Sequence, residues 1–384
     1  MEKQSDRFLS LDIFRGLTIA GMILVNNPGD WGNIYPALEH AKWNGCTPTD
    51  LVFPFFLFIV GVAVTLSLSK RKEKGDNHNK LILQIFKRSV LIFLIGVALS
   101  GFPTYNFSTI RIPGVLQRIA LVYFFASLIY LKTNWKTQTV LASSFLFVYW
   151  ALITLIPIPG IGAPDLSQPT IIDKLTNKEI APNLVAWIDN QILSGHLWRQ
   201  TKIWDPEGLL STLPAISTGL IGILLGTFLK GSLDSIQKTA WIFFFGNVGL
   251  MTGIIWDMYF PMNKALWTSS YVIFTAGMAL NVFGMCYWLA DVKKITWWTK
   301  SFVVYGMNAI TVYVLSGVLS VMLSRISWIN EAGIKVTVKS FLYNTFFTPY
   351  LTPINASLAW ALFYVLFWLG IMWIFYKKKI FLKV

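Results

Sequence analysis

The 384-residue chain is 55% hydrophobic and only 13% charged, with a mean hydropathy of +0.57. Its apolar residues form runs of roughly 17 to 25 residues with few charges, the length at which a helix crosses a bilayer, and this excludes an ordinary soluble globular protein. The net charge of +14 comes from short clusters beside these runs, without an aromatic-interleaved basic face, and this excludes nucleic-acid binding.

The apolar runs predict ten helical spans, in chain order at 11–28, 50–69, 84–101, 113–131, 136–157, 208–230, 238–257, 265–290, 301–323 and 357–377. Because a helix satisfies its own backbone in lipid, the chain is predicted to be an all-α, polytopic membrane helix bundle. It shows no internal repeat and no soluble domain, so residues 1–384 are predicted to form one transmembrane domain. The first run contains Asp12 and Arg15 and lacks a small-x-small cleavage site, and we expect it to be retained as a span.

The positions of Lys and Arg predict the orientation of these spans. Basic clusters such as 70–72 and 377–379 fall in one set of loops and near the termini, while the opposite set carries fewer basic residues. By the positive-inside rule, both termini are then cytoplasmic. Long outer loops follow at about 158–207 and 324–356, with short interfacial helices predicted in NLVAWIDNQILSGHLW and KVTVKSFLYNTFF.

A polar stretch, EHAKWNGCTPTD, precedes the second predicted span and contains His40. Neutral imidazole is the usual base near pH 7, although an interfacial histidine is more often structural. Asp50 forms a capping box with Thr47, or hydrogen-bonds the imidazole or a substrate amine, and the two roles are compatible. Asn26 and Asn27 end the first span, where they either terminate the helix or hold a ring or a reacting carbonyl oxygen.

Two arginines within predicted spans need partners, because an unpaired charge in lipid costs several kcal/mol. Arg15 pairs with Asp12 one turn away, or faces a phosphate-bearing ligand from the cytoplasm. Arg118, in RIPGVLQRIA, either grips a phosphate bidentately or meets an acidic side chain. The candidate acidic partners are Asp205, Glu207 and Asp257.

Polar residues also stand at the outer ends of later spans. Asp205 and Glu207 flank Pro206, which suits a helix N-terminus or a cationic substrate. Asn263 and Lys264 form a polar cluster before the eighth span, where Lys264 is more typical of a snorkelling anchor than of a catalytic amine.

Five blocks together resemble a known family: LSLDIFRGLTIAGMILVNN, EHAKWNGCTPTDLVFPFFLFIVG, RIPGVLQRIALVYF, DPEGLLSTLPAI and FPMNKALWTSSYV. They keep their order from Leu9 to about Val272 and are similar to the bacterial branch of the heparan-α-glucosaminide N-acetyltransferase family, within the transmembrane acyltransferase superfamily. The resemblance implies an enzyme that moves acetyl from cytoplasmic acetyl-CoA to a glucosamine amino group on the other membrane face. The expected location is a bacterial inner membrane.

The resemblance also implies roles for particular residues. The family's active-site histidine matches His40, and its asparagine matches Asn26, although altered spacing keeps Asn27 open. Its arginines match Arg111 and Arg118, and its Asn-Lys pair matches 263–264. Lysosomal members carry a lumenal region before the first span, which this sequence lacks, so we expect a small amino sugar, a wall fragment or a glycosaminoglycan breakdown product as acceptor.

Residues and resemblance together predict three groups of site residues. The predicted catalytic residues are His40, Asn26 and Asp50. The predicted acetyl-CoA contacts are Arg15, Arg118 and Asn44. The predicted acceptor contacts are Glu39, Asp205, Glu207, Asp257, Asn263 and Lys264.

The predicted cosubstrate is acetyl-CoA, without a metal, and the predicted partners are an amino-sugar acceptor and membrane lipid, with a homodimer left open. His40 acts as general base, or as a nucleophile that carries acetyl; the base is favoured because acyl-imidazole is labile to water. Two alternatives remain: an amino-sugar transporter without chemistry, and an O-acyltransferase acting on a surface glycan hydroxyl.

Overall fold

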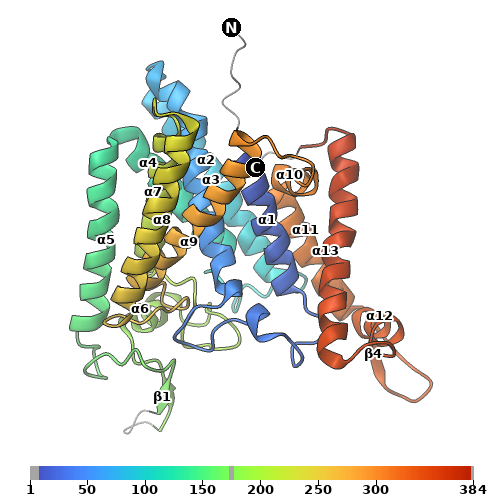
Figure 1. The fold of residues 1–384 in the computed structure, drawn as a ribbon. Coiled ribbons are helices and arrows are strands. Elements are labelled where there is room, and N and C mark those ends of the chain that lie inside the picture. The colour runs from blue at the N-terminus through green and yellow to red at the C-terminus, as the bar shows by residue number, and fades with distance from the viewer. Residues whose placement is uncertain (1–7, 173–176, 382–384) are drawn as a thin grey trace. The chain divides into compact units, whose positions relative to one another are not determined.

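The computed structural model describes residues 8–172 and 177–381, most of which are helical (Figure 1). The α-helices are α1 (Leu9–Asn26), α2 (Val52–Glu73), α3 (His78–Gly101), α4 (Val115–Lys132), α5 (Trp135–Leu155), α6 (Leu184–Leu193), α7 (Thr212–Leu229), α8 (Ser235–Asp257), α9 (Ser269–Cys286), α10 (Lys300–Met307), α11 (Ala309–Arg325), α12 (Val338–Phe346) and α13 (Pro353–Lys377). Two 3₁₀ turns, η1 (Pro36–Leu38) and η2 (Pro48–Leu51), precede α2, and a π-helical segment, η3 (Tyr287–Val292), extends α9.

Two short antiparallel hairpins complete the secondary structure of the described chain. Strand β1 (Ile171–Ile172) pairs with β2 (Glu179–Ile180), and β3 (Ser327–Ile329) pairs with β4 (Lys335–Thr337). Helix α6 lies within the first predicted interfacial segment. The second such segment starts as strand β4 and becomes helical at Val338, where Thr337 caps α12.

Within the described residues, nine helices are long and apolar enough to cross a membrane, and ten spans result if α10 and α11 count as one. Those two helices are bent by 81° around Asn308, which is the break within the ninth predicted span. The prediction of an all-α polytopic bundle with about ten spans is therefore confirmed. The orientation of the termini stays a prediction, and residues 1–7 and 382–384 lie outside the described part.

The contacts fall into two compact units. The first unit contains Ala41–Cys46 and Pro54–Trp288, and the second contains Phe8–His40, Thr47–Phe53 and residues 289–381. The assignment of the whole chain to one acyltransferase domain stays a prediction.

In the first unit, helices pack closely through small residues. Helices α8 and α9 lie side by side, α3 packs on α4, and α5 on α7 (Figure 1). A Cβ added at Gly61 in α2 would lie 2.0 Å from the carbonyl oxygen of Gly219 in α7, so these two backbones touch. Such small-residue contacts drive association where lipid offers no hydrophobic gain. An apolar cluster that includes Tyr149, Phe260 and Leu266 fills the end of this unit near α6.

In the second unit, α1 is the central helix and packs against α10, α11 and α13. A Cβ at Gly16 would lie 1.8 Å from the carbonyl oxygen of Phe302 in α10, so this contact also requires glycine. The start of α1 has no local side-chain cap. Instead, the Asp291 carboxylate in η3 accepts hydrogen bonds from the backbone N–H groups of Leu9 (3.1 Å) and Ser10 (3.0 Å), which satisfies two donors that a helix start leaves open. Helix α12 packs beside the first turns of α13 (Figure 1).

Because α1 and α10 touch at Gly16, adding a single methyl group at this position should destabilise the protein. Gly16→Ala should lower the thermal unfolding midpoint of the detergent-solubilised protein, because overpacking a closed contact costs about 1–3 kcal/mol. The matched control is Gly370→Ala in α13, where an added Cβ meets no atom within 4 Å. That control should leave the midpoint unchanged or raise it slightly, since alanine favours helix more than glycine. Equal midpoints for both variants would contradict this packing.

Candidate functional site

The segment between α1 and α2 is built from two 3₁₀ turns that hydrogen-bond to each other. The hydroxyl of Thr49 in η2 donates to the carbonyl oxygen of Ala37 in η1 at 3.2 Å. The hydroxyl of Thr47 lies 2.6 Å from the carbonyl oxygen of Glu39 and donates to it. Pro48 at the first position of η2 suits a turn whose first N–H has no partner. These contacts fix the backbone on both sides of His40.

The His40 imidazole meets the Asp50 carboxylate. Nδ1 of His40 lies 2.6 Å from Oδ1 of Asp50. The Asp50 side chain is 1% exposed, whereas the His40 side chain is 46% exposed. Because a carboxylate only accepts hydrogen bonds, the proton of the neutral ring belongs on Nδ1, and Nε2 is then the basic nitrogen. This is the arrangement in which an acid orients a catalytic histidine.

Asp50 performs both of the roles considered from sequence. Its second oxygen, Oδ2, accepts a hydrogen bond from the backbone N–H of Thr47 at 3.0 Å, which is the capping contact. Its first oxygen contacts His40. The cap therefore fixes the carboxylate, and the fixed carboxylate positions the ring.

The two asparagines at the end of α1 differ in their surroundings. Asn27 is buried, and its side-chain amide donates to the carbonyl oxygen of Ile23 at 2.8 Å, so it terminates α1. Asn26 is the last residue of α1 and is exposed. The structure therefore places Asn26, rather than Asn27, where it can meet a ligand.

Arg15 also lies in the second unit, two turns from the start of α1. Its Nη1 is 3.5 Å from Oδ1 of Asp12 and 3.4 Å from the carbonyl oxygen of Gly306. The expected pair within α1 is thus present, at a long distance. A phosphate contact by Arg15 stays a prediction.

The first unit contains a buried ion cluster around Arg111. Its Nε and Nη2 donate to the two oxygens of Asp205 at 2.8 and 2.5 Å, and Nη2 also donates to Glu207. Its guanidinium lies over the ring of Trp198. Burial alone would lower the pKa of Arg111, but the hydrogen bond to Asp205 and the charges of Glu207 and Asp205 raise it above the ordinary value. Two of the three acids that the sequence offered to Arg118, Asp205 and Glu207, are thus engaged by Arg111.

Arg118 is fully buried and binds the polypeptide itself. It donates to the carbonyl oxygens of Pro206 (2.9 Å) and Gly208 (3.0 Å) and to the hydroxyl of Ser211. Its Cζ lies 5.0 Å from the centre of the Trp267 ring, a cation–π contact. Arg118 therefore holds the turn before α7, and its predicted contact with a CoA phosphate stays a prediction.

In the first unit, a predicted acetyl-CoA contact, Asn44, is hydrogen-bonded to a predicted acceptor contact, Asn263. The side-chain amide of Asn263 donates to Oδ1 of Asn44 at 3.0 Å, and Asn263 is fully buried. Asp257 accepts a hydrogen bond from the backbone N–H of Met262 at 2.6 Å, which closes the turn after α8. Lys264 lies in the following turn and is partly buried.

Asp189 is not among the predicted site residues, although it belongs to the NLVAWIDNQILSGHLW segment that was predicted to form an interfacial helix. Asp189 lies in α6 and is fully buried. Oδ1 accepts from the backbone N–H of Leu209 at 2.8 Å, and Oδ2 has no hydrogen-bond partner among the described residues. Burial, together with the nearby charge of Asp205, raises the pKa of Asp189 to about 7. Among residues 8–172 and 177–381, no cluster of three His, Cys, Asp or Glu side chains could hold a metal.

Comparison with known proteins agrees with the blocks noted in the sequence. Residues 7–173 match the family model described as heparan-alpha-glucosaminide N-acetyltransferase, catalytic. The resemblance to this family is confirmed. The heparan-alpha-glucosaminide N-acetyltransferases of Mus musculus and Homo sapiens are each 29% identical to the chain, over 353 and 352 residues. These alignments cover 81% and 80% of the chain but 53% and 52% of the relatives, so the chain spans about half their length.

The match to the heparan-alpha-glucosaminide N-acetyltransferase model includes the segment that carries His40 and Asp50. It also includes Asn26, Arg15 and Arg118. The acids that surround Arg111, and the Asn263–Lys264 pair, lie beyond residue 173.

Because the pKa of the buried Asp189 is raised, the stability of the folded protein should depend on pH. Its folded-state pKa of about 7 exceeds the ordinary 3.8, so the folded protein retains a proton that the unfolded chain loses. Stability should therefore fall as pH rises from about 4 to about 7. Asp189→Asn removes this pH dependence. The free energy of unfolding of the variant minus that of the native protein should therefore increase between pH 5 and pH 8, by up to about 3 kcal/mol. Thermal unfolding of both proteins at pH 5 and pH 8 measures this difference in stability.

Asp165→Asn is the matched control for Asp189→Asn. Hydrogen bonds from the Ser167 side chain and backbone lower the pKa of Asp165. Its charge therefore does not change between pH 5 and pH 8, and neither should the difference between this variant and the native protein. A pH-independent difference for Asp189→Asn as well would show that Asp189 is ionised throughout this range.

Proposed function

We propose that the chain is a transmembrane N-acetyltransferase that moves acetyl from acetyl-CoA to the amino group of a glucosamine-type sugar. The observation that carries the proposal is the His40–Asp50 contact, which makes Nε2 of an exposed histidine the basic nitrogen. The relatives over this region are N-acetyltransferases by name, which supports the reaction class.

The proposed reaction balances without a metal or a redox partner. The sugar amine attacks the thioester carbonyl carbon, and a C–N bond forms. Nε2 of His40 takes the proton that the amine loses, and the carbon–sulfur bond then breaks. The proton passes to the departing sulfur, so that the products are the N-acetylated sugar and CoA thiol.

Asp50 and Asn26 assist His40 in this proposal. Asp50 keeps the ring in the tautomer that accepts a proton and stabilises the imidazolium that forms. Asn26, exposed at the end of α1, donates a hydrogen bond to the oxyanion of the tetrahedral intermediate. We favour His40 as base over acetyl carrier, because its 46% exposure would leave an acetyl-imidazole open to water.

The remaining site residues are proposed as binding contacts. Arg15, with Arg118 and Asn44, is proposed for CoA, whose phosphates are anionic. Glu39, Asp257, Asn263 and Lys264 are proposed for the acceptor. Asp205 and Glu207 already neutralise Arg111, so their contact with a sugar ammonium group requires this cluster to open. Asp205 and Glu207 are proposed as acceptor contacts on that condition.

We further propose that both termini are cytoplasmic, that acetyl-CoA enters from the cytoplasm and that His40 acts at the opposite face. The excess of Lys and Arg in one set of loops supports this orientation. An inner bacterial membrane is the proposed location.

The activity is tested by release of CoA thiol from acetyl-CoA by the purified protein in liposomes, with glucosamine as acceptor. Thiol release should require glucosamine and should fall by about 10²–10⁴-fold in His40→Ala, the range for loss of a general base. His78→Ala is the control, because this exposed histidine begins α3 and belongs to no proposed site. Full activity of His40→Ala would refute its role, and transport of sugar without thiol release would identify a transporter.

A panel of acceptors tests the chemical class of the substrate. Amines such as glucosamine should be acetylated, and matched sugars that carry a hydroxyl in place of the amine should not. The physical reason is that a neutral amine is a better nucleophile than an alcohol. An amine can attack the thioester before it loses its proton, so His40 needs only to take that proton late in the reaction. Acetylation of the hydroxyl sugars alone would assign an O-acyltransferase instead.

A further inference from the structure

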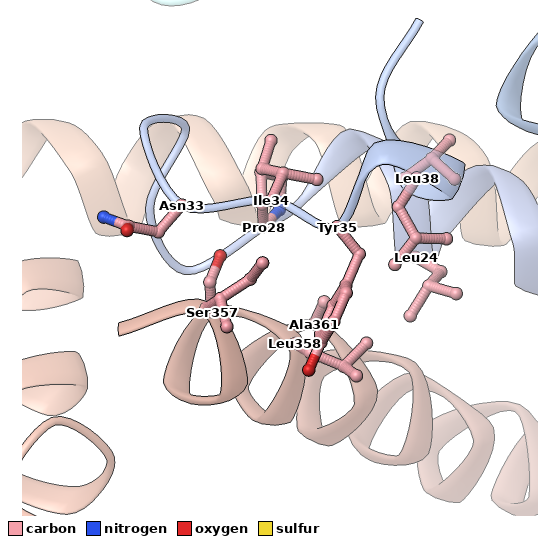
Figure 2. A pocket seen from close by; sticks show the side chains of 11 residues that line it. Leu24, Pro28, Asn33, Ile34, Tyr35, Leu38, Ser357, Leu358 and Ala361 are labelled. Atoms are coloured by element: carbon pink, nitrogen blue, oxygen red, sulfur yellow. The ribbon is translucent and has the colours of Figure 1, made fainter. Parts of the chain in front are cut away.

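In the second unit, the loop that follows α1 is tied to the first turns of α13. The hydroxyl of Ser357 in α13 donates to the carbonyl oxygen of Asp30 at 3.0 Å and accepts from the backbone N–H of Asp30 at 3.1 Å. The carbonyl oxygen of Ser357 accepts from the N–H of Gly29 at 3.2 Å. In Figure 2 the loop runs along α13, and a small apolar pocket lined by residues such as Leu24 and Leu38 lies between them. Ser357 thus holds two successive residues of the loop.

Helix α12 holds the residue that precedes these two. Nζ of Lys339 donates to the carbonyl oxygen of Pro28 at 2.8 Å. A lysine on an interfacial helix ordinarily extends its ammonium group into water, whereas Lys339 is partly buried, and this burial lowers its pKa. Tyr343, one turn further along α12, closes on Gly29, where an added Cβ would clash with the Tyr343 ring. Lys339 and Ser357 therefore clamp three successive residues of the loop.

The same loop is tied to α13 a second time before it reaches His40. The hydroxyl of Tyr35 donates to Oδ1 of Asn355, near the start of α13, at 2.6 Å. The turn η1 that comes next is hydrogen-bonded to η2. Backbone that is held at several points by other elements opens rarely. The path of the chain from Asn26 to His40 is therefore set by α12, α13 and η2.

This clamp lies between the two groups that the proposed reaction requires. Asn26 is two residues before Pro28, so their Cα atoms are within about 7 Å of each other. His40 follows the clamped residues at the far end of the loop. An oxyanion donor and a base must keep their relative position to within about 0.5 Å, and the last turn of a helix frays unless it is held. The clamp supplies that restraint.

We propose that Lys339 and Ser357 are positioning residues for acetyl transfer, which hold the side chain of Asn26 in register with His40 by fixing the loop between them. This inference rests on the proposed N-acetyltransferase function and adds two residues to its site. Neither residue touches the reacting atoms. Because the hydrogen bond from Asn26 forms to the oxyanion of the transition state, loss of the clamp should lower kcat and leave the KM values nearly unchanged.

Steady-state kinetics of Lys339→Met and, separately, Ser357→Ala test the inference, with acetyl-CoA and glucosamine as substrates. Each substitution should lower kcat by about tenfold, because a small displacement of an aligned group costs one to two orders of magnitude in rate. Lys339→Arg keeps a donor at this position and should recover most of the loss. An unchanged kcat in both Lys339→Met and Ser357→Ala would overturn the inference.

Two control variants make the same chemical changes away from the clamp. Lys335→Met removes an exposed lysine of β4. Ser316→Ala removes a buried hydroxyl that donates to the carbonyl oxygen of Tyr313 within α11. Both controls should keep the native kcat. A tenfold loss in these controls as well would show a general sensitivity of the second unit and would contradict a specific clamp.

A double-mutant cycle with Asn26→Ala separates positioning from general support of the fold. If Lys339 and Ser357 act through Asn26, their substitutions will have almost no further effect on kcat in the Asn26→Ala protein. Losses that multiply, or an Asn26→Ala protein with full activity, would overturn the inference, while CoA thiol release by the native protein would leave the proposed function intact. Absence of glucosamine-dependent thiol release from the native protein would overturn the proposed function and the inference with it.

Discussion

The candidate site depends on one buried carboxylate, that of Asp50. Asp50 is 1% exposed and receives hydrogen bonds on both oxygens, from the backbone of Thr47 and from the ring of His40. A buried charge is costly unless it is paired and hydrogen-bonded, so the turn, the cap and the imidazole are needed together. The same contacts orient the His40 ring. The Asp50 carboxylate thus both fixes the backbone of the loop and leaves Nε2 as the basic nitrogen of His40.

The two units place charge in different ways. In the second, the carboxylates of Asp50 and Asp291 each satisfy the backbone at the start of a turn or helix. In the first, Arg111 and Arg118 bind acids and carbonyl oxygens around the turn that leads into α7. Asp189, whose second oxygen is not hydrogen-bonded, is the exception, and burial raises its pKa accordingly. Strained or incompletely satisfied polar groups of this kind often lie near functional sites.

Sequence alone predicted the helical membrane class, because long apolar runs have no other stable form in lipid. It also offered both contacts of Asp50 as compatible alternatives, since Thr-Pro-Thr-Asp is a local signal and His40 lies only ten residues away. It could not assign the acids near Arg118, because Arg111 and Arg118 lie seven residues apart and about ninety residues from Asp205, and only folding decides which arginine takes it. The cap on α1 by Asp291 and the pocket beside Leu38 were missed for the same reason: their parts are hundreds of residues apart.

The most direct measurement of the central claim is a double-mutant cycle on His40 and Asp50 with acetyl transfer as the readout. If Asp50 acts by orienting His40, Asp50→Asn will lower transfer in the native background and will have almost no further effect once His40→Ala is present, because residues that act as a unit are strongly non-additive. Losses that multiply, with Asp50→Asn as harmful in the His40→Ala protein as in the native one, would contradict the account.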